Sequence, residues 1–369
     1  MSLAERVNAV IDAALVQRIV GCVIVINKDG EEVYARAAGL ADREAATAMR
    51  RDTVFRLASV TKPIVATAVL RLVDLGLIGL NDRVTRYLPW FTPHNPDGSV
   101  ADIRIRHLLS HTSGLVYGRL PDDASGGLSG VVNSLTETLQ NLAKVPLAFA
   151  PGTGWDYGTG IDVLGGVLAA INGSSVEDAI GRYVTGPLGM TDAHFYVTDP
   201  ARLATPYADG TPPVRMGEPH GIPDNGGTTT TTFSPARILN PAAPQNGGAG
   251  MAGTADDVMK MLEVYNGRPG LLAPETVATA LANQIGDLPR REQDAGKRFG
   301  FLGAVLADPA AANNPCPAGT VDWGGAWGHN WVVDPHNRMT IVVCTNTTFE
   351  GCNGLFRDDI LRAVYPVEN

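Results

Sequence analysis

Membrane spans and export signals are among the features that this 369-residue sequence lacks. No apolar run reaches the roughly 18 residues that a spanning helix needs. Charged residues interrupt the start of the chain at Glu5, Arg6, Asp12 and Arg18, where a signal peptide would be apolar. The net charge of −9 disfavours nucleic acid and anionic membrane surfaces as partners. We therefore expect a cytoplasmic protein that binds neither membranes nor nucleic acids.

Cysteine is scarce, and its spacing indicates neither a zinc site nor a redox motif. The four cysteines form no C-x-x-C pair and have no histidine at zinc-site spacing. Cys22 and Cys344 lie in apolar, strand-like runs and are expected to be buried free thiols. Cys316 and Cys352 lie in loop-like segments, and whether they pair is left open, although a cytoplasmic location disfavours a disulfide.

Motifs for metals, phosphates and the α/β-hydrolase nucleophile are also missing. His107 and His111 have the i, i+4 spacing of a zinc pair, but no carboxylate ligand pattern accompanies them. The chain has no glycine-rich phosphate loop, no internal repeat and no G-x-S-x-G elbow around a serine. We therefore predict that the protein uses no metal and no cofactor.

Charge is low, and apolar residues are abundant. The chain is 44% hydrophobic and 18% charged, compared with about 25% charged in an average globular protein. A large core can therefore form, and extensive disorder is not expected. The 42 glycines and 25 prolines indicate many loops and tight turns, especially over residues 118–131 and 209–248.

The order of the apolar patterns predicts an α+β fold, an α/β sandwich built from both ends of the chain. The first 17 residues have helical spacing, a β-hairpin follows over residues 21–37, and a last amphipathic helix covers residues 355–364. Strand patterns return at residues 299–306, 320–333 and 339–346. We predict an antiparallel sheet flanked by terminal helices, formed by residues 1–78 and 245–369, with a mostly helical domain inserted over residues 79–244.

The sequence Ser-Val-Thr-Lys at residues 59–62, just before an apolar helical run, carries the strongest chemical signal. Ser59 and Lys62 are three residues apart at a helix start and share one helix face. A serine hydroxyl becomes a good nucleophile when a neighbouring base takes its proton, and the helix N-terminus favours developing negative charge. One S-x-x-K match is expected by chance in a chain of about this length and ordinary composition, so the interpretation depends on other motifs.

Two further segments can supply a proton carrier and oxyanion donors. Tyr157 lies beside a glycine on a loop that leads into a helix, where its hydroxyl can act as a base next to a lysine, or its ring can simply pack at the helix start. The segment Trp-Gly-Gly-Ala-Trp-Gly-His at residues 323–329 has strand-like flanks. Its glycines permit close approach of a ligand to the backbone, or form a bulge or tight hairpin.

Taken together, these motifs resemble the serine β-lactamase and penicillin-binding-protein superfamily, and most closely the class C β-lactamase-like carboxylesterases known as family VIII esterases. The likeness covers nearly the whole chain. It includes residues 53–62, Leu-Leu-Ser-His-Thr-Ser-Gly-Leu at 108–115, Tyr157, the turn at 250–257 and the Trp-Gly-Gly segment. The resemblance implies a β-lactamase/transpeptidase-like fold.

The resemblance also implies roles for individual residues. Ser59 matches the acylated serine, Lys62 the lysine of its motif and Tyr157 the tyrosine of a Tyr-x-Asn motif. The backbone N–H groups of Ser59 and Ala326 would form the oxyanion hole. Substrate contacts are expected at the Trp-Gly-Gly wall and at the residues near it, namely Trp323, Gly324, Gly325, Trp327, His329 and Thr159. Asp162 is expected to order the Tyr157 loop.

Two departures from the lactamase pattern bear on the substrate. Thr159 stands in place of the Asn of Tyr-x-Asn, and Trp323 stands in place of the Lys of a Lys-Thr-Gly motif, which removes a cation that would pair with a substrate carboxylate. We therefore predict a serine carboxylesterase that cleaves short-chain esters through an acyl-enzyme on Ser59. A β-lactamase, a D-amino-acid peptidase or amidase, and an acyltransferase remain as alternatives. The intact Ser59, Lys62 and Tyr157 argue against a scaffold or sensor without turnover.

Overall fold

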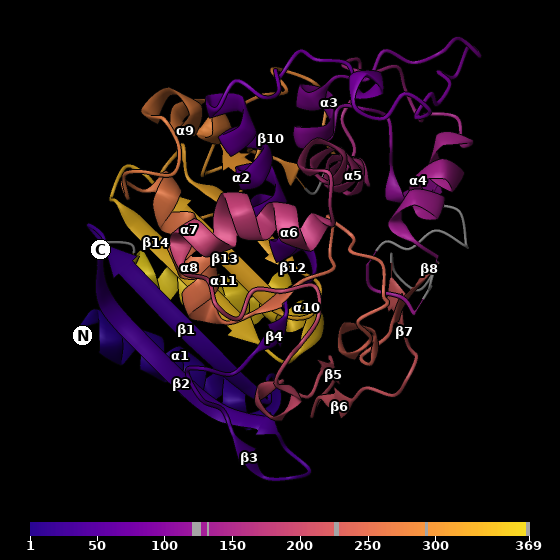
Figure 1. Cartoon of the computed structure of the whole chain (residues 1–369). Helices are drawn as coiled ribbons and strands as arrows, with labels where there is room; N and C mark the ends of the chain where they lie inside the picture. The colour runs from indigo at the N-terminus through magenta and orange to yellow at the C-terminus, as the bar shows by residue number, and fades with distance from the viewer. Residues whose placement is uncertain (120–126, 131–132, 225–228, 292–293, 367–369) are drawn as a thin grey trace.

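The centre of the fold is an eight-stranded antiparallel sheet in the order β10-β11-β12-β13-β14-β1-β2-β3 (Figure 1). The computed structural model describes residues 1–119, 127–130, 133–224, 229–291 and 294–366. The strands of the sheet are β1 (Gly21–Lys28), β2 (Glu31–Asp42), β3 (Thr47–Ala48), β10 (Lys297–Phe299), β11 (Ala304–Leu306), β12 (Val321–Gly325), β13 (His329–Asp334) and β14 (Met339–Thr345). Since β1 pairs with β14, the two ends of the chain meet in one sheet, and the predicted antiparallel sheet is confirmed.

Strand β1 shows why the sheet strands are apolar without interruption. Its side chains alternate between two hydrophobic clusters: Val23 and Val25 face one, while Cys22, Ile24 and Ile26 face the other. Successive side chains of a strand point to opposite faces. A sheet covered on both faces therefore needs apolar residues at every position, and the two clusters are its two covered faces.

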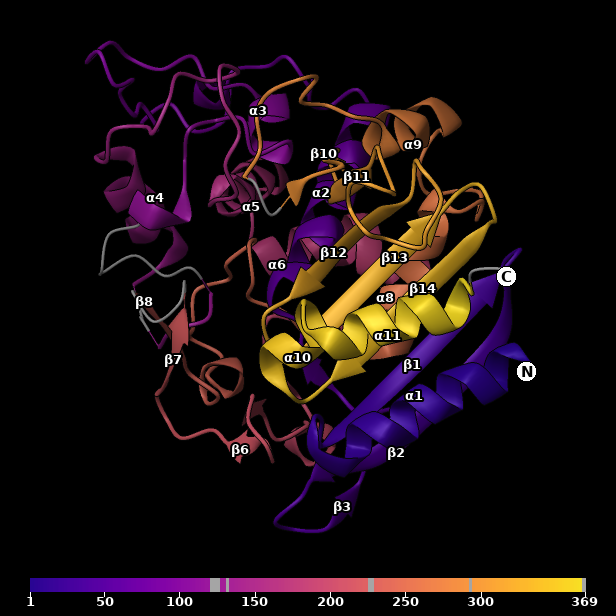
Figure 2. The same cartoon turned by 180° about the vertical axis from the view of Figure 1, so that it is seen from behind.

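Terminal helices cover one face of the sheet (Figure 2). The helices α1 (Leu3–Gln17), α10 (Thr348–Cys352) and α11 (Leu355–Val364) contribute to the second cluster or pack beside it. Ser2 and Glu5 form a capping box at the start of α1. Arg18, just after α1, bonds Asp359 of α11 at 2.8 Å. The two chain ends are therefore tied together, as the helical spacing at both ends predicted.

Helices from the middle of the chain lie over the other face (Figure 1). Helix α8 (Ala255–Leu262) packs on β14 and β1, whereas α2 (Thr61–Asp74) packs against α5 (Gly160–Asn172) and α6 (Val176–Ile180). Most residues of α2 are buried, so it forms the core of this helical layer. One continuous hydrophobic cluster joins the sheet to these helices. Helix α2 belongs to the predicted sheet domain, which includes residues 1–78, but it packs against α5 and α6 of the predicted inserted domain.

The inserted segment contains helices and short hairpins. Its remaining elements are α3 (Ile105–Leu109), α4 (Leu135–Ala143), α7 (Gly186–Leu188), β5 (Tyr207–Ala208), β6 (Val214–Arg215), β7 (His220–Asp224) and β8 (Thr229–Phe233). Two hairpins therefore occupy part of the 209–248 stretch that was predicted to be loop. In the other predicted loop, 118–131, residues 120–126 and 131 lie outside the described part of the chain. Downstream, α9 (Pro274–Leu281) precedes β10. The short strand β4 (Phe55–Arg56) pairs with β9 (Ala252–Gly253) and comes just before Ser59 in the chain.

Two long strand predictions are each split by a turn. The 299–306 run forms β10 and β11, because Gly300 and Gly303 close a turn with a 2.9 Å backbone hydrogen bond. The 320–333 run forms the β12–β13 hairpin, so the glycine segment is a tight hairpin.

All four cysteines are free, and Cys316 and Cys352 do not pair. Among the described residues, no helix is long and apolar enough to cross a membrane.

Candidate active site

Ser59 and Lys62 lie together at the start of α2. Ser59 occupies a 3₁₀ turn, Ala58–Val60, that leads directly into the helix, and Lys62 lies in the first helical turn. Lys62 Nζ is 3.2 Å from Ser59 Oγ. Ala58 has a φ of 47°, a conformation that is unfavourable for a residue with a side chain and that recurs at functional sites. The predicted pairing of serine and lysine is therefore present in the fold.

Lys62 is 3% exposed and donates hydrogen bonds to three oxygens. Its ammonium reaches Ser59 Oγ, Tyr117 Oη at 3.0 Å and the Gly248 carbonyl at 2.6 Å. Burial alone lowers the pKa of Lys62, but interactions with Tyr117, Tyr157 and Asp162 outweigh it and raise that pKa above its usual value. An ammonium with all three N–H groups donated is a cationic hydrogen-bond donor to Ser59, and it has no lone pair with which to act as a base.

Tyr117 is a residue of the candidate site that sequence reasoning missed. It lies in a short 3₁₀ turn, Tyr117–Arg119, and its hydroxyl accepts from Lys62. Burial raises the pKa of Tyr117, and the Lys62 cation opposes that shift. No spacing rule connects Tyr117 with Lys62. Its place two residues after the Leu-Leu-Ser-His-Thr-Ser-Gly-Leu segment was the only available signal.

Tyr157 lies beside Lys62, on the loop before α5. The Lys62 ammonium is 4.7 Å from the centroid of the Tyr157 ring, and the rings of Tyr117 and Tyr157 are 5.5 Å apart. The Trp323 indole N–H donates a hydrogen bond to Tyr157 Oη at 3.0 Å. The fold therefore brings the predicted tyrosine to the predicted lysine, with Trp323 of β12 as an additional partner.

His111 packs against Tyr157 and bonds the loop that carries it. Its Nδ1 accepts from the Gly158 N–H at 3.2 Å, and its ring lies 4.7 Å from that of Tyr157. Burial holds the pKa of His111 well below its usual value, so the ring is neutral with its proton on Nε2. His107 instead accepts from the Arg104 N–H at the start of α3. Over the described ranges, no group of His, Cys, Asp and Glu side chains could hold a metal ion.

The Trp-Gly-Gly segment brings β12 against the turn that carries Ser59. A Cβ on Gly325 would overlap the Leu57 carbonyl oxygen, and a Cβ on Gly324 would lie 2.7 Å from Cys352 Sγ. Both positions therefore need glycine for close packing. Ala326 is half-buried and lies beyond the last β12–β13 pair, Gly325 with His329, so its N–H is outside the strand ladder. This location is compatible with the predicted oxyanion donor.

The other predicted substrate contacts differ in exposure. Trp323 is half-buried and touches Tyr157 and Phe299, which suits a wall of the site. Trp327 is only 5% exposed, and its ring packs against Phe233 at 4.8 Å. Thr159 is buried at the start of α5, and its hydroxyl has no hydrogen-bond partner among the described residues. Of these residues, Trp323 has the setting that best fits contact with a substrate.

His329 is placed where a structural role fits better than the substrate contact that was expected. It is 1% exposed, and its Nε2 lies 2.7 Å from the Arg56 carbonyl oxygen. Its ring meets that of Phe55 edge to face at 5.5 Å. Burial lowers the pKa of His329 to about 4, which keeps the ring neutral. The side chain therefore connects β13 to β4, the strand just before Ser59.

Comparisons with known proteins identify the family and the fold. The Beta-lactamase family model matches residues 7–363. Esterase EstB of Burkholderia gladioli is 46% identical over 375 residues, which cover 99% of this chain and 95% of EstB. The solved structure of EstCE1, described as a hydrolase with promiscuous acyltransferase activity, superposes with a TM-score of 0.93 at 39% identity and covers 98% of each chain.

A more distant relative has a different activity in its name. Acyltransferase calJ of Penicillium decumbens is 29% identical over 352 residues, which cover 84% of this chain and 80% of the relative. The family match, the EstB likeness and the EstCE1 superposition together confirm the predicted β-lactamase/transpeptidase-like fold. The chain therefore belongs to the beta-lactamase family.

Proposed function

We propose that the protein is a serine carboxylesterase that hydrolyses short-chain, uncharged esters through an acyl-enzyme on Ser59. The observation that carries this proposal is the hydrogen bond between Lys62 Nζ and Ser59 Oγ at the start of α2. The esterase class has independent support in the likeness to EstB and EstCE1 over nearly the whole chain. The site residues and the individual steps are our assignment.

In the first half of the reaction, Ser59 Oγ forms a bond to the ester carbonyl carbon, and the bond from that carbon to the alkoxide oxygen breaks. Lys62 remains a cation and stabilises negative charge on the neighbouring phenol oxygens. Tyr157 works in its phenolate form: it takes the Ser59 proton and passes it to the leaving alkoxide. In the second half, water attacks the acyl-enzyme carbonyl carbon and Tyr157 takes a water proton. The bond from that carbon to Ser59 Oγ then breaks, Tyr157 returns the proton to Ser59, and the carboxylic acid leaves.

Backbone donors stabilise the charge that develops on the carbonyl oxygen. The N–H groups at a helix start have no partner within the helix, which applies to Ser59 at the entry to α2. Ala326, in the turn after β12, provides the second N–H. Loss of one such donor in other hydrolases lowers kcat by about 10²- to 10³-fold. The close packing of Gly325 on Leu57 holds the two donors near each other.

A neutral substrate fits the charges around Ser59. Lys62 already donates its three N–H groups within the protein. Arg56 is bound to the carbonyls of Pro235 and Ala204 and lies over the Trp327 ring. Trp323 occupies the place at which the resemblance to lactamases implies a lysine. An ester without a carboxylate needs no cation and gains from apolar contact with Trp323.

A serine-directed fluorophosphonate probe tests the nucleophile. We expect one covalent adduct on Ser59, located by mass spectrometry after proteolysis, and no ester hydrolysis by Ser59→Ala. Ser234→Ala is the matched control, because Ser234 lies in the same region beside Trp327 but its hydroxyl donates to Glu218. The control should be labelled and active. Labelling of another serine, or activity in Ser59→Ala, would overturn the assignment.

Acyl transfer is a second candidate, favoured by the names of two relatives. EstCE1 is described with promiscuous acyltransferase activity, and calJ is named an acyltransferase. An acyl-enzyme on Ser59 can pass its acyl group to an alcohol instead of water. Chromatography of the products in the presence of a primary alcohol would measure the ratio of new ester to free acid. A ratio that rises with alcohol concentration supports transfer by the same intermediate.

A further inference from the structure

Asp162 is a buried carboxyl group that the proposed chemistry does not yet use. It lies in the first turn of α5 and is 1% exposed. Its Oδ1 accepts hydrogen bonds from the Gly248 N–H at 3.0 Å and from Asn246 Nδ2 at 3.3 Å. Its Oδ2 has no hydrogen-bond partner among the described residues. A buried carboxyl group with an unused oxygen is costly, so its presence here needs a reason.

Gly248 connects Asp162 to the catalytic lysine. The N–H of Gly248 donates to Asp162, and the carbonyl oxygen of the same residue accepts from Lys62 Nζ at 2.6 Å. The fit is tight, because a Cβ on Gly248 would overlap Asp162 Oδ2, and a Cβ on Gly247 would lie 2.6 Å from the Ile161 carbonyl oxygen. The position of the Gly248 peptide therefore depends on the Asp162 side chain.

A second buried cation, Arg237, is linked to Asp162 through Asn246. Arg237 donates to the Pro244 carbonyl and, at 2.8 Å, to Asn246 Oδ1. Asn246 in turn donates to Asp162, so hydrogen bonds connect Arg237 to Lys62 through the loop at residues 244–248. Burial raises the pKa of Asp162 and lowers that of Arg237 to about 10, and the opposite charges counter both shifts.

The charged and titratable groups around Lys62 leave Asp162 as its acidic neighbour. Tyr117 and Tyr157 face the ammonium, and in the proposed reaction Tyr157 is negatively charged only until it takes the Ser59 proton; His111 is held neutral by burial. Lys62 would be strongly disfavoured as a cation in this buried setting without a negative charge nearby. Asp162 supplies a negative charge that does not depend on the proton transfer, and Arg237 is a second cation that interacts with it.

We propose that Asp162 is a positioning residue for Lys62, fixing the Gly248 carbonyl that binds the ammonium and supplying the negative charge that keeps Lys62 protonated. This inference rests on the proposed function, in which Lys62 works as a cation. It makes the loop at 244–248 part of the catalytic support and assigns Asp162 to Lys62 rather than to the Tyr157 loop alone.

The substitution Asp162→Asn removes the negative charge of the side chain and keeps its shape. An asparagine in this place keeps an oxygen that accepts from Gly248 and Asn246, and its new N–H₂ group occupies the place of the unpartnered Oδ2. We expect kcat for a neutral ester to fall about 10- to 100-fold, as for misplaced catalytic groups, with little change in KM. Since loss of the negative charge lowers the pKa of Lys62, the alkaline limit of kcat should move to lower pH.

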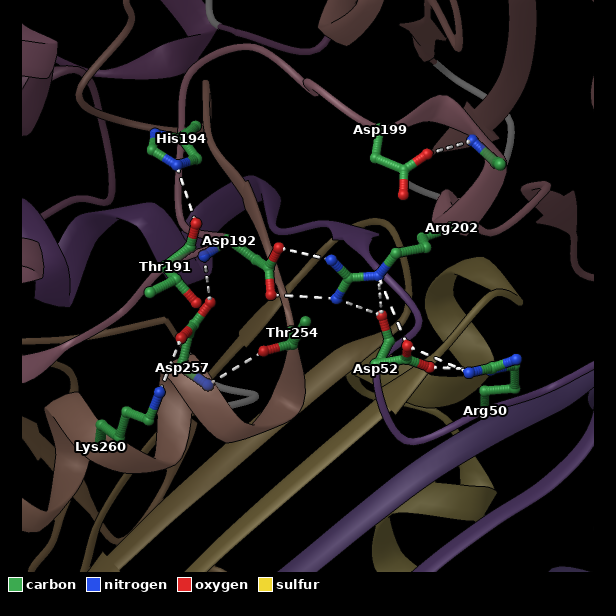
Figure 3. Close-up of polar contacts among 11 residues, drawn as sticks. Arg50, Asp52, Thr191, Asp192, His194, Asp199, Arg202, Thr254, Asp257 and Lys260 are labelled. Atoms are coloured by element: carbon green, nitrogen blue, oxygen red, sulfur yellow. Dashed lines mark hydrogen bonds and ion pairs between the residues drawn. The ribbon is translucent and has the colours of Figure 1, made fainter.

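Asp257→Asn is the matched control (Figure 3). Asp257 on α8 is also 1% exposed, and burial raises its pKa as it raises that of Asp162. Its oxygens accept from the Asp192 N–H at 3.1 Å and from Lys260 at 3.3 Å, away from Lys62. This variant should lose stability while its kcat and alkaline limit remain those of the wild type. The rate is expressed per Ser59 titrated with the fluorophosphonate probe, which counts intact sites.

A purely structural role for Asp162 predicts that Asp162→Asn and Asp257→Asn behave alike, and that result would overturn the inference. If Asp162→Asn does not fold, Gly248→Ala decides, because it keeps the carboxylate but displaces the peptide. A wild-type kcat in Gly248→Ala overturns the inference, and a kcat at least about 10-fold lower with Ser59 still labelled supports it. Failure of the probe to label Ser59 in the wild type would instead count against the proposed function.

Discussion

The Trp323 indole N–H donates a hydrogen bond to the Tyr157 hydroxyl oxygen at 3.0 Å. This contact joins the strand wall of the site to its proton carrier. This hydrogen bond fixes the orientation of the Tyr157 hydroxyl, and the Lys62 ammonium lies 4.7 Å from the centroid of the Tyr157 ring. Trp323 therefore has two roles in our proposal: it replaces a cation that would bind a substrate carboxylate, and it orients Tyr157 for proton transfer.

Trp323→Phe tests the second role, because phenylalanine keeps an aromatic ring and removes the N–H. We expect kcat to fall about 10-fold, at the low end for groups in proton transfer. KM for the ester should change little, because the aromatic wall remains. Trp331→Phe is the control, since Trp331 is paired with Trp323 across the hairpin and its own N–H is unpartnered among the described residues. A wild-type kcat in Trp323→Phe would contradict this role.

The two tyrosines at Lys62 should differ in their effect on rate. We expect Tyr157→Phe to lower kcat by at least about 10²-fold as the general base. Tyr117→Phe should lower it by about 10-fold, because it removes only one of the three oxygens that hold Lys62. Tyr265→Phe, which removes a buried hydroxyl that bonds Thr67 at 2.7 Å, should change stability without changing kcat. A larger loss in Tyr117→Phe than in Tyr157→Phe would assign the base to Tyr117.

The buried His329 makes stability depend on pH. Burial lowers its pKa in the folded protein to about 4, below the ordinary value of 6.5. Its contribution to stability is therefore complete above pH 6.5 and is lost as the pH falls toward 4, by up to about 3 kcal/mol. Urea unfolding at pH 7 and pH 4 should show a smaller acid loss in His329→Gln than in wild type. His336→Gln, at an exposed position, should lose as much as wild type.

Local patterns predicted the fold and the contact between Ser59 and Lys62 correctly, for clear physical reasons. Uninterrupted apolar runs mark strands covered on both faces, as in β1, and helical spacing marks the two terminal helices. Ser59 and Lys62 were accessible to sequence reasoning because one helix start places them together. Their predicted catalytic roles, with that of Tyr157, remain predictions to be tested by the variants above.

Contacts between distant segments were beyond the reach of those patterns. Tyr117 meets Lys62 across 55 positions, and Gly248 meets it across 186. No periodicity connects such residues, so neither Tyr117 nor the Gly248 loop was identified from the sequence. His329 lies close to the glycine segment, which suggested a substrate contact, and the contact of its ring with the Arg56 carbonyl of β4 was likewise not accessible from the sequence. The substrate contact remains a prediction.

The substrate class is the prediction on which the leading hypotheses differ most. A penicillin or a D-amino-acid peptide carries a carboxylate, and burial of that charge without a partner costs several kcal/mol. Where the resemblance to lactamases implies a lysine, this chain has Trp323, whose N–H is already donated to Tyr157. A short aryl or alkyl ester has no carboxylate and packs its apolar groups against the same ring. We therefore expect kcat/KM for such esters to exceed that for benzylpenicillin by at least about 10³-fold, which corresponds to about 4 kcal/mol of transition-state stabilisation.

Steady-state kinetics on both substrates with one enzyme preparation would measure this ratio. Trp323→Lys should lower the ratio of kcat/KM for the ester to that for benzylpenicillin in two ways. The lysine adds a cation for the penicillin carboxylate, and the substitution removes the aromatic surface and the N–H that serve the ester. Trp90→Lys, at an exposed tryptophan, is the control for an added charge and should leave the ratio unchanged. Comparable kcat/KM for penicillin and ester in the wild type would favour the lactamase alternative, because the intact Ser59 and Lys62 would then act on a charged substrate without the cation that our argument requires.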